Sequence, residues 1–188
     1  MGTISLVKGQ KVDLTKTNPE VAKFRIGLGW NPQAAVGQDF DLDVSAFVLG
    51  ANGKRLSDKH FVFYNNLKSP NDSVVHTGDN LTGAGDGDDE VLTVDFSKIE
   101  PEATEIVFVT TIHEATERSQ NFGQVNGSYI RIMDDSTGNV IMHYDLNEDA
   151  STETAMQFGK LYKKDGEWKF EATGTGQVGG LQSFLDRF

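Results

Sequence analysis

The chain has 188 residues, a hydrophobic fraction of 37% that includes twelve Phe, and no Cys. A formal net charge of −11 argues against nucleic acid or an anionic membrane as a direct electrostatic partner of the free chain. The absence of Cys excludes disulfides, thiolate catalysis and zinc–thiolate sites. We find no signal-peptide pattern and no apolar run long enough to span a membrane, so we expect one cytoplasmic domain over residues 1–188.

Alternating or continuous apolar runs predict a chain built mostly of β-strands. The expected strands cover residues 24–30, 42–49, 60–64, 91–96 and 106–112. Residues 106–112 are almost uniformly apolar, which is typical of a strand buried on both faces. Two hairpins follow, one with its turn at residues 135–139 and one whose turn is Asp165-Gly166, a pair that suits a tight primed turn.

Helical signal is sparse. Residues 114–121 are expected to form one or two turns of helix, and residues 180–188 a short amphipathic helix with Leu181, Phe184, Leu185 and Phe188 on one stripe. Short strands at intervals of roughly ten residues, separated by Gly, Asn and Asp turns, are typical of a sandwich. The predicted fold class is therefore all-β dominated, a β-sandwich of two sheets with short helices that include a C-terminal helix.

Acidic residues concentrate in residues 78–90, which hold five carboxylates and four glycines and no Lys or Arg. A second cluster lies upstream, where Asp39, Asp41 and Asp43 alternate with apolar residues along a predicted strand. Alternation places these three carboxylates on one face and Phe40, Leu42 and Val44 on the other. Like charges this dense repel one another unless a cation lies between them.

Hard oxygen ligands on glycine-rich loops favour Ca²⁺, which takes about six to eight oxygens, over zinc or copper. The pattern is not an EF-hand, because Val44 and Gly50 stand where that motif requires Gly and a bidentate Glu. We predict a site for two Ca²⁺ ions whose candidate ligands combine both clusters with two amides that end an intervening strand. These candidates are Asp39, Asp41, Asp43, Asn65, Asn66, Gly78, Asp79, Asp86, Asp88, Asp89 and Glu90.

A simpler interpretation stays open, in which both clusters are solvated turns, since Asp, Asn and Gly are ordinary turn residues. The four His residues lack metal-binding spacing, although His76 and His113 could lie near the acidic segments. Arg131 is expected to be an ordinary surface cation. No nucleophile motif, phosphate-binding loop or dinucleotide fingerprint is present.

The two acidic segments, with Phe-Tyr-Asn-Asn-Leu at residues 63–67 and Gly-Glu-Trp-Lys-Phe at residues 166–170, resemble the TerD family of tellurium-resistance and stress proteins. The resemblance covers almost the whole chain. It implies a Ca²⁺-binding β-sandwich linked to resistance to tellurite, phages and colicins, with membrane-bound or enzymatic partners in a stress-response complex. Asp39, Asp41, Asp43, Asp79, Asp88 and Glu90 fall in the family's acidic motifs.

Two functions follow from these patterns. The first is a non-enzymatic, Ca²⁺-dependent adaptor or scaffold for partner proteins, cytoplasmic or peripheral at the inner membrane surface, without direct nucleic-acid binding and without a transmembrane segment. The alternative is a metal-dependent hydrolase acting on a phosphorylated substrate, since clustered carboxylates can hold paired metals that activate water.

Overall fold

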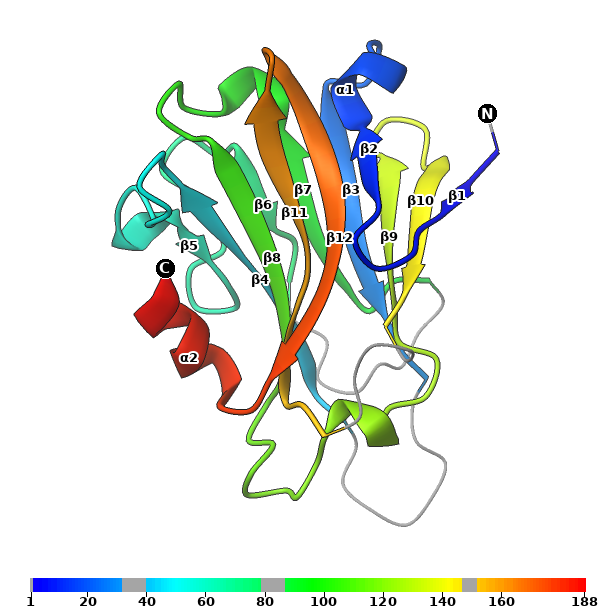
Figure 1. The fold of residues 1–188 in the computed structure, drawn as a ribbon, viewed down its shortest axis with the longest axis vertical. Coiled ribbons are helices and arrows are strands. Elements are labelled where there is room, and N and C mark those ends of the chain that lie inside the picture. The colour runs from blue at the N-terminus through cyan, green and yellow to red at the C-terminus, as the bar shows by residue number, and fades with distance from the viewer. Residues whose placement is uncertain (1, 32–39, 79–86, 147–151) are drawn as a thin grey trace.

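A computed structural model of the chain describes residues 2–31, 40–78, 87–146 and 152–188. The strands in these residues form two six-stranded sheets that face each other (Figure 1). The first sheet has the strand order β1 (Ile4–Ser5), β10 (Val140–Asp145), β9 (Tyr129–Asp134), β3 (Lys23–Gly29), β7 (Glu90–Asp95) and β6 (Val74–His76). The second sheet has the order β2 (Lys11–Asp13), β12 (Glu167–Gln177), β11 (Ala155–Lys164), β8 (Glu105–Ile112), β4 (Leu42–Leu49) and β5 (Phe61–Val62).

Neighbouring strands are antiparallel except for β1, which pairs in parallel with β10. The helices of the described residues are α1 (Leu14–Thr17) and α2 (Gly180–Arg187), with short 3₁₀ turns at Asp58–His60, Phe96–Lys98 and Phe122–Gln124. Neither helix of the described residues is long and apolar enough to cross a lipid bilayer.

The main core lies between the two sheets, because alternate residues of each strand point inward. Phe24, Ile26 and Leu28 of β3 are buried there, facing Leu42 and Val44 of β4. The large aromatic and branched side chains of this layer supply the apolar burial that stabilises the sandwich.

Helix α2 lies beside the second sheet (Figure 1). A second apolar cluster joins this helix to the outer face of that sheet. Phe184 and Phe188 of the C-terminal segment are buried against Phe47 of β4, and the rings of Phe47 and Phe188 lie 5.2 Å apart. The second sheet is therefore apolar on both faces in this region, which explains the continuous apolar pattern of residues 106–112.

The structure confirms the predicted sandwich, both hairpins and the C-terminal helix. Asp165 and Gly166 have φ values of 55° and 83°, as a primed turn requires. Two local predictions were wrong. Residues 60–64 contribute only the two-residue strand β5, and residues 114–121 form turns and no regular helix. The polar stretch 114–121 carries no apolar stripe that could dock a helix on the sheets, and this explains the second error.

Candidate metal centre

β3 ends and β4 and β7 begin at one end of the sandwich (Figure 1). Most of the described acidic candidates lie in or next to these strand ends. Leu28 of β3 pairs with Glu90 of β7, and the Glu90 carboxylate crosses to the other sheet, where the backbone N–H of Val44 donates a hydrogen bond to Oε2 at 2.5 Å. We call the described residues Asp41, Asp43, Asp88, Asp89 and Glu90 the acidic end. The candidates Asp39, Asp79 and Asp86 lie outside the described residues.

Asp43 lies on the outer face of the second sheet. Leu42 and Val44 point into the main core, as predicted from the alternation, and the Asp43 carboxylate points to the opposite side. Asp41 and Asp43 are both buried, with 7% and 6% of their surface exposed. The predicted alternation is confirmed for Asp43, whose neighbours Leu42 and Val44 lie in the main core, whereas Asp41 precedes β4.

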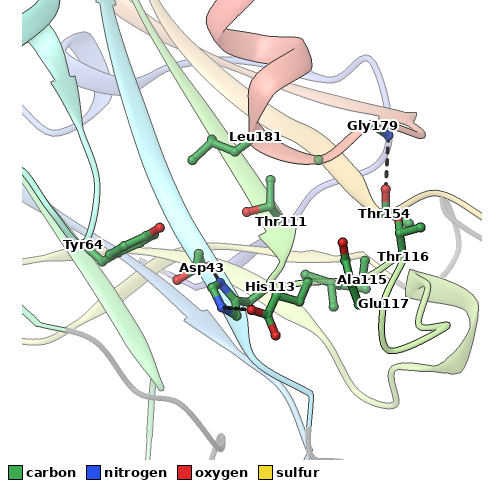
Figure 2. A pocket seen from close by; sticks show the side chains of 13 residues that line it. Asp43, Tyr64, Thr111, His113, Ala115, Thr116, Glu117, Thr154, Gly179 and Leu181 are labelled. Atoms are coloured by element: carbon green, nitrogen blue, oxygen red, sulfur yellow. Dashed lines mark hydrogen bonds and ion pairs between the residues drawn. The ribbon is translucent and has the colours of Figure 1, made fainter.

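His113 flanks this part of the acidic end (Figure 2). Its backbone N–H donates to the carbonyl of Asp41 at 2.8 Å, and its Nδ1 lies 4.0 Å from Oδ2 of Asp43. Together with Tyr64 and Thr111, Asp43 and His113 line a cavity of about 260 Å³ that opens beside the first turn of α2. A hollow lined by polar and apolar side chains therefore lies next to the Asp43 carboxylate.

Glu90 points into the sandwich, beside His76. The two side chains are 0% and 1% exposed, and Nε2 of His76 lies 3.5 Å from Oε2 of Glu90. The backbone N–H of Gly78 donates to Nδ1 of His76 at 3.2 Å, so in the neutral ring Nε2 carries the proton and faces Glu90. The sequence indicated that His76 could lie near the acidic segments, and the pairing of β6 with β7 places it beside Glu90.

Asp89 is fixed to the end of β3. Its backbone N–H donates to the carbonyl of Leu28 at 2.8 Å, and its Oδ2 accepts a hydrogen bond from the Trp30 backbone N–H at 2.9 Å. Burial raises the pKa of the Asp89 carboxyl; the hydrogen bond from Trp30 opposes this and the charge of Asp88 adds to it, leaving the pKa above its ordinary value. Asp89 is therefore a carboxylate whose charge the protein alone stabilises poorly.

Asp88 pairs with Arg131 of β9, whose Nε lies 2.6 Å from Oδ1. The expectation that Arg131 is an ordinary surface cation was wrong, because its side chain is 28% exposed and neutralises a carboxylate that is only 5% exposed. Sequence reasoning missed this residue because forty-odd positions separate it from Asp88, and only the β9–β3–β7 order brings them together.

The remaining candidates lie at turns. Asn65 is exposed after β5, and the side-chain amide of Asn66 donates to the carbonyl of Phe61 at 2.6 Å, which fastens that turn. Gly78 follows β6 with a φ of 142°, a value that favours glycine. The prediction that these residues contribute metal ligands stays a prediction.

The donor chemistry of the acidic end fits a hard cation, since it consists of buried carboxylates and backbone carbonyls. The described side chains nevertheless diverge. Asp43 faces outward from the second sheet, Glu90 lies between the sheets, and Asp88 lies over the first sheet. Among the described residues, no three His, Asp or Glu side chains come together as a metal-ligand group.

Comparison with known proteins supplies the family. The family model for the TerD domain matches residues 1–188. The chain is 54% identical over 186 residues to "Tellurium resistance protein TerD" of Alcaligenes sp, which covers 99% of this chain and 97% of that protein. It is 55% identical over 180 residues to "General stress protein 16U" of Bacillus subtilis (strain 168), covering 95% and 93% of the two chains.

A solved structure, described as a homologue of telluride resistance protein (TerD) from Streptomyces coelicolor A3(2), has the same fold. It superposes with a TM-score of 0.73 at 17% identity, covering 87% of this chain and 95% of that one. The chain belongs to the TerD family of tellurium resistance and stress response proteins. The family resemblance drawn from the acidic segments is thereby confirmed.

Proposed function

We propose that the protein binds Ca²⁺ at the acidic end and acts as a non-enzymatic, metal-dependent adaptor in the tellurium and stress response of its family. The observation that carries this proposal is the burial of several carboxylates at one end of the sandwich. Asp41, Asp43 and Glu90 are all at least nine-tenths buried, and the Asp89 pKa is raised. Buried like charges are costly unless a cation or a proton compensates them.

Two groups of residues would hold the metal. Asp43 belongs to the start of β4 and Asp41 immediately precedes that strand, while Asp89 ends the segment that enters β7. The candidates outside the described residues, Asp39, Asp79 and Asp86, are part of the same proposal. Bound Ca²⁺ supplies positive charge to this end, which removes the repulsion among the carboxylates and makes the surface tolerate anionic partners.

The adaptor part of the proposal is supported by the names of two relatives. Two relatives carry the names of a tellurium resistance protein and a general stress protein, without an enzymatic activity in either name. The proposed partners are proteins of a stress-response complex, at the inner membrane surface or in the cytoplasm. The proposal includes resistance to tellurite, phages and colicins as the process served.

Calorimetric titration of chelator-treated protein with Ca²⁺, repeated in excess Mg²⁺, tests the metal. We expect saturable Ca²⁺ binding near two ions per chain that survives Mg²⁺. Asp43→Asn should weaken Ca²⁺ binding at least about tenfold. Asp135→Asn, which changes a carboxylate at the opposite end of the sandwich, is the matched control and should bind as wild type. Absence of Ca²⁺ binding by the wild type would overturn the proposal.

The hydrolase alternative has its own outcome in the same preparation. A phosphatase would release phosphate from p-nitrophenyl phosphate with Mg²⁺ or Mn²⁺, and Asp43→Asn would abolish the release. Turnover with that dependence would replace the adaptor. We expect none, because the sequence carries no nucleophile motif and no phosphate-binding loop.

A further inference from the structure

The outer face of the first sheet carries a slot made by two glycines of β3. Gly27 and Gly29 alternate with the core residues of that strand, so both face outward. A Cβ on Gly27 would lie 2.0 Å from Oδ2 of Asp88, and a Cβ on Gly29 would lie 2.4 Å from Cζ of Tyr129. Neither glycine has a positive φ, so neither is needed for a turn. The missing side chains make room for two other side chains.

Arg131 lies against that slot and is held in place from two sides. Its Nε lies 2.6 Å from Oδ1 of Asp88, and its guanidinium lies 5.7 Å from the ring centre of Tyr129. The Tyr129 hydroxyl in turn donates a hydrogen bond to the carbonyl of Gly87 at 3.3 Å. The Asp88 carboxylate is therefore buried over Gly27, with the Arg131 guanidinium as its counter-charge.

These contacts hold one short segment, residues 87–90, which we call the loop base. The four residues are tied to three parts of the sandwich. Residue 87 and Asp88 contact Tyr129 and Arg131 of β9, Asp89 contacts Leu28 and Trp30 at the end of β3, and Glu90 contacts Val44 of β4. Among these contacts of the loop base, only that of Asp88 is an ion pair with an arginine. Its carboxylate points away from the sides on which Asp43 and Glu90 lie.

We propose that Arg131 is a positioning residue for the metal centre: it anchors Asp88 in the Gly27 slot and so fixes the loop base. Asp88 then serves the site by holding Asp89 and its neighbours in place, and its carboxylate does not coordinate the ion. This inference rests on the Ca²⁺ site proposed above. It assigns Asp88 a different role from the ligand role predicted from the sequence.

A double-mutant cycle separates the two roles. Asp88→Asn, Arg131→Gln and the double variant are compared by Ca²⁺ calorimetry and, after chelation, by denaturant unfolding. We expect each single substitution to raise the Kd for Ca²⁺ about tenfold, as loss of a supporting partner does. The double variant should be no weaker than either single variant, because both remove the same contact. Arg131→Lys, which keeps the charge, should recover part of the affinity.

Arg25→Gln is the matched control. Arg25 lies on the same outer face of β3, two residues before Gly27, and its Nη2 pairs with Oδ1 of Asp135 at 2.8 Å. It does not contact the loop base, so its loss should leave the Kd for Ca²⁺ unchanged. Weakening of Ca²⁺ binding by Arg25→Gln equal to that of Arg131→Gln would overturn the assignment, since any lost surface charge would then suffice.

A ligand role for Asp88 gives a different result. Asp88→Asn would then abolish binding at its site, whereas Arg131→Gln would keep or improve the affinity by freeing the carboxylate. That pattern overturns the inference while leaving the proposed function intact. If the wild type binds no Ca²⁺, the proposed function fails and the positioning of a metal centre fails with it. The unfolding data then test only the contact between Asp88 and Arg131. Coupled effects of the two substitutions on the free energy of unfolding support this contact as an anchor, and additive effects overturn it.

Discussion

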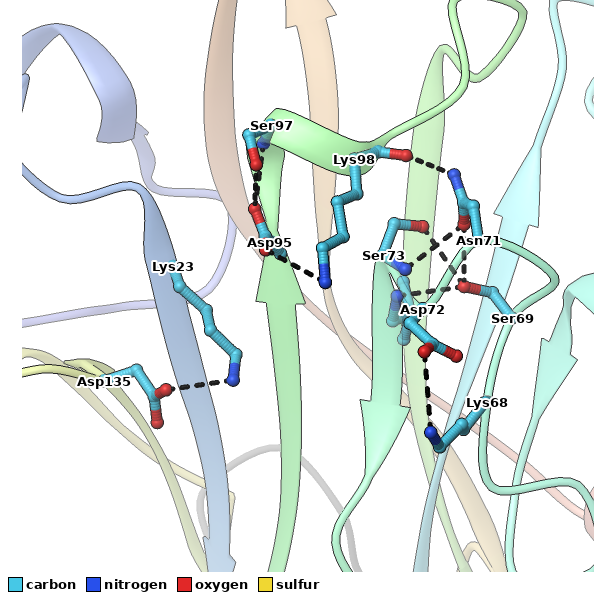
Figure 3. Close-up of polar contacts among 11 residues, drawn as sticks. Lys23, Lys68, Ser69, Asn71, Asp72, Ser73, Asp95, Ser97, Lys98 and Asp135 are labelled. Carbon is cyan, nitrogen blue, oxygen red and sulfur yellow. Dashed lines mark hydrogen bonds and ion pairs between the residues drawn. The ribbon is translucent and has the colours of Figure 1, made fainter.

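The two ends of the sandwich treat the same residue type in opposite ways. At the β9–β10 turn, partial burial raises the pKa of Asp135, but hydrogen bonds from Lys23 and Arg25 outweigh it and the pKa lies below its ordinary value. Figure 3 shows the Lys23 contact. A side-chain hydrogen bond from Thr137 lowers the pKa of the neighbouring Asp134. At the acidic end, by contrast, burial leaves the pKa of Asp89 raised.

This difference shows that the free-energy cost of burying carboxylates falls mainly at the acidic end. Carboxylates at the β9–β10 turn have partners suited to their charge and contribute to stability by ordinary means. Those at the acidic end are more buried, and the partners placed beside Asp43 and Glu90 include histidines at 4.0 Å and 3.5 Å. A protein that concentrates buried acids at one end in this way gains most from a ligand that brings positive charge there.

The largest expected effect of that difference is stabilisation by Ca²⁺. At about 100 times Kd, Ca²⁺ should raise the free energy of unfolding by about 2.7 kcal/mol for each site filled, because only the folded chain has the sites. Thermal unfolding with and without chelator measures the shift. Asp43→Asn should lose most of the shift, and Asp135→Asn should keep it. Equal loss in both variants would show that Ca²⁺ acts on the net charge and not on one end.

Glu90 provides the next test, in chelated protein. Glu90→Ala removes the acceptor of the Val44 N–H at the junction of the two sheets, and an unmade buried hydrogen bond should cost about 2 kcal/mol. Glu90→Gln keeps an acceptor of the same size and should cost less. Denaturant unfolding measures both variants. If Glu90→Ala is as stable as wild type, the free energy gained by removing the buried charge equals that lost with the hydrogen bond. The contact between the sheets would then make no net contribution to stability.

The strands could be predicted from the sequence because their signal is local. The contacts of the site could be predicted only in part, because some of them depend on the order of strands in the sheet. The local apolar pattern of residues 42–49 and 106–112 predicts their strands. Asp165-Gly166 predicts its turn because both residues tolerate the positive φ values that the turn needs. The candidate acids of the described residues were also named from local composition. Arg131 was not assigned to them, and His76 was placed near them without a named partner, because the partners of both come from strand order in the first sheet. The two-residue strand β1 has too few residues to carry a pattern.

The Asp135 pair should give a smaller effect that depends on pH. Its folded pKa is depressed below 3.8, so the stability it contributes is present above the unfolded pKa and is lost as pH falls through the folded value. Lys23 and Arg25 are 43% and 40% exposed, so solvent screening limits the pair to about 1 kcal/mol. Asp135→Asn should be less stable by up to that amount at neutral pH, and the difference should shrink below pH 3.8 in acid unfolding.

Asp89→Asn should give the smallest effect, and one of opposite sign. Because the folded pKa of Asp89 is raised, the folded chain favours the protonated carboxyl, and the charged form lowers stability as pH rises through the folded pKa. An amide oxygen can still accept the Trp30 N–H, so the substitution removes charge and keeps the hydrogen bond. Chelated Asp89→Asn should therefore be slightly more stable than wild type at neutral pH, by less than about 1 kcal/mol.

With Ca²⁺ in excess the order should reverse, since the variant gives up the charge that the metal would neutralise. A variant that is less stable than wild type in both conditions would mean that Asp89 is an ordinary capping carboxylate, and the contrast between the two ends would then rest on Asp41, Asp43 and Glu90.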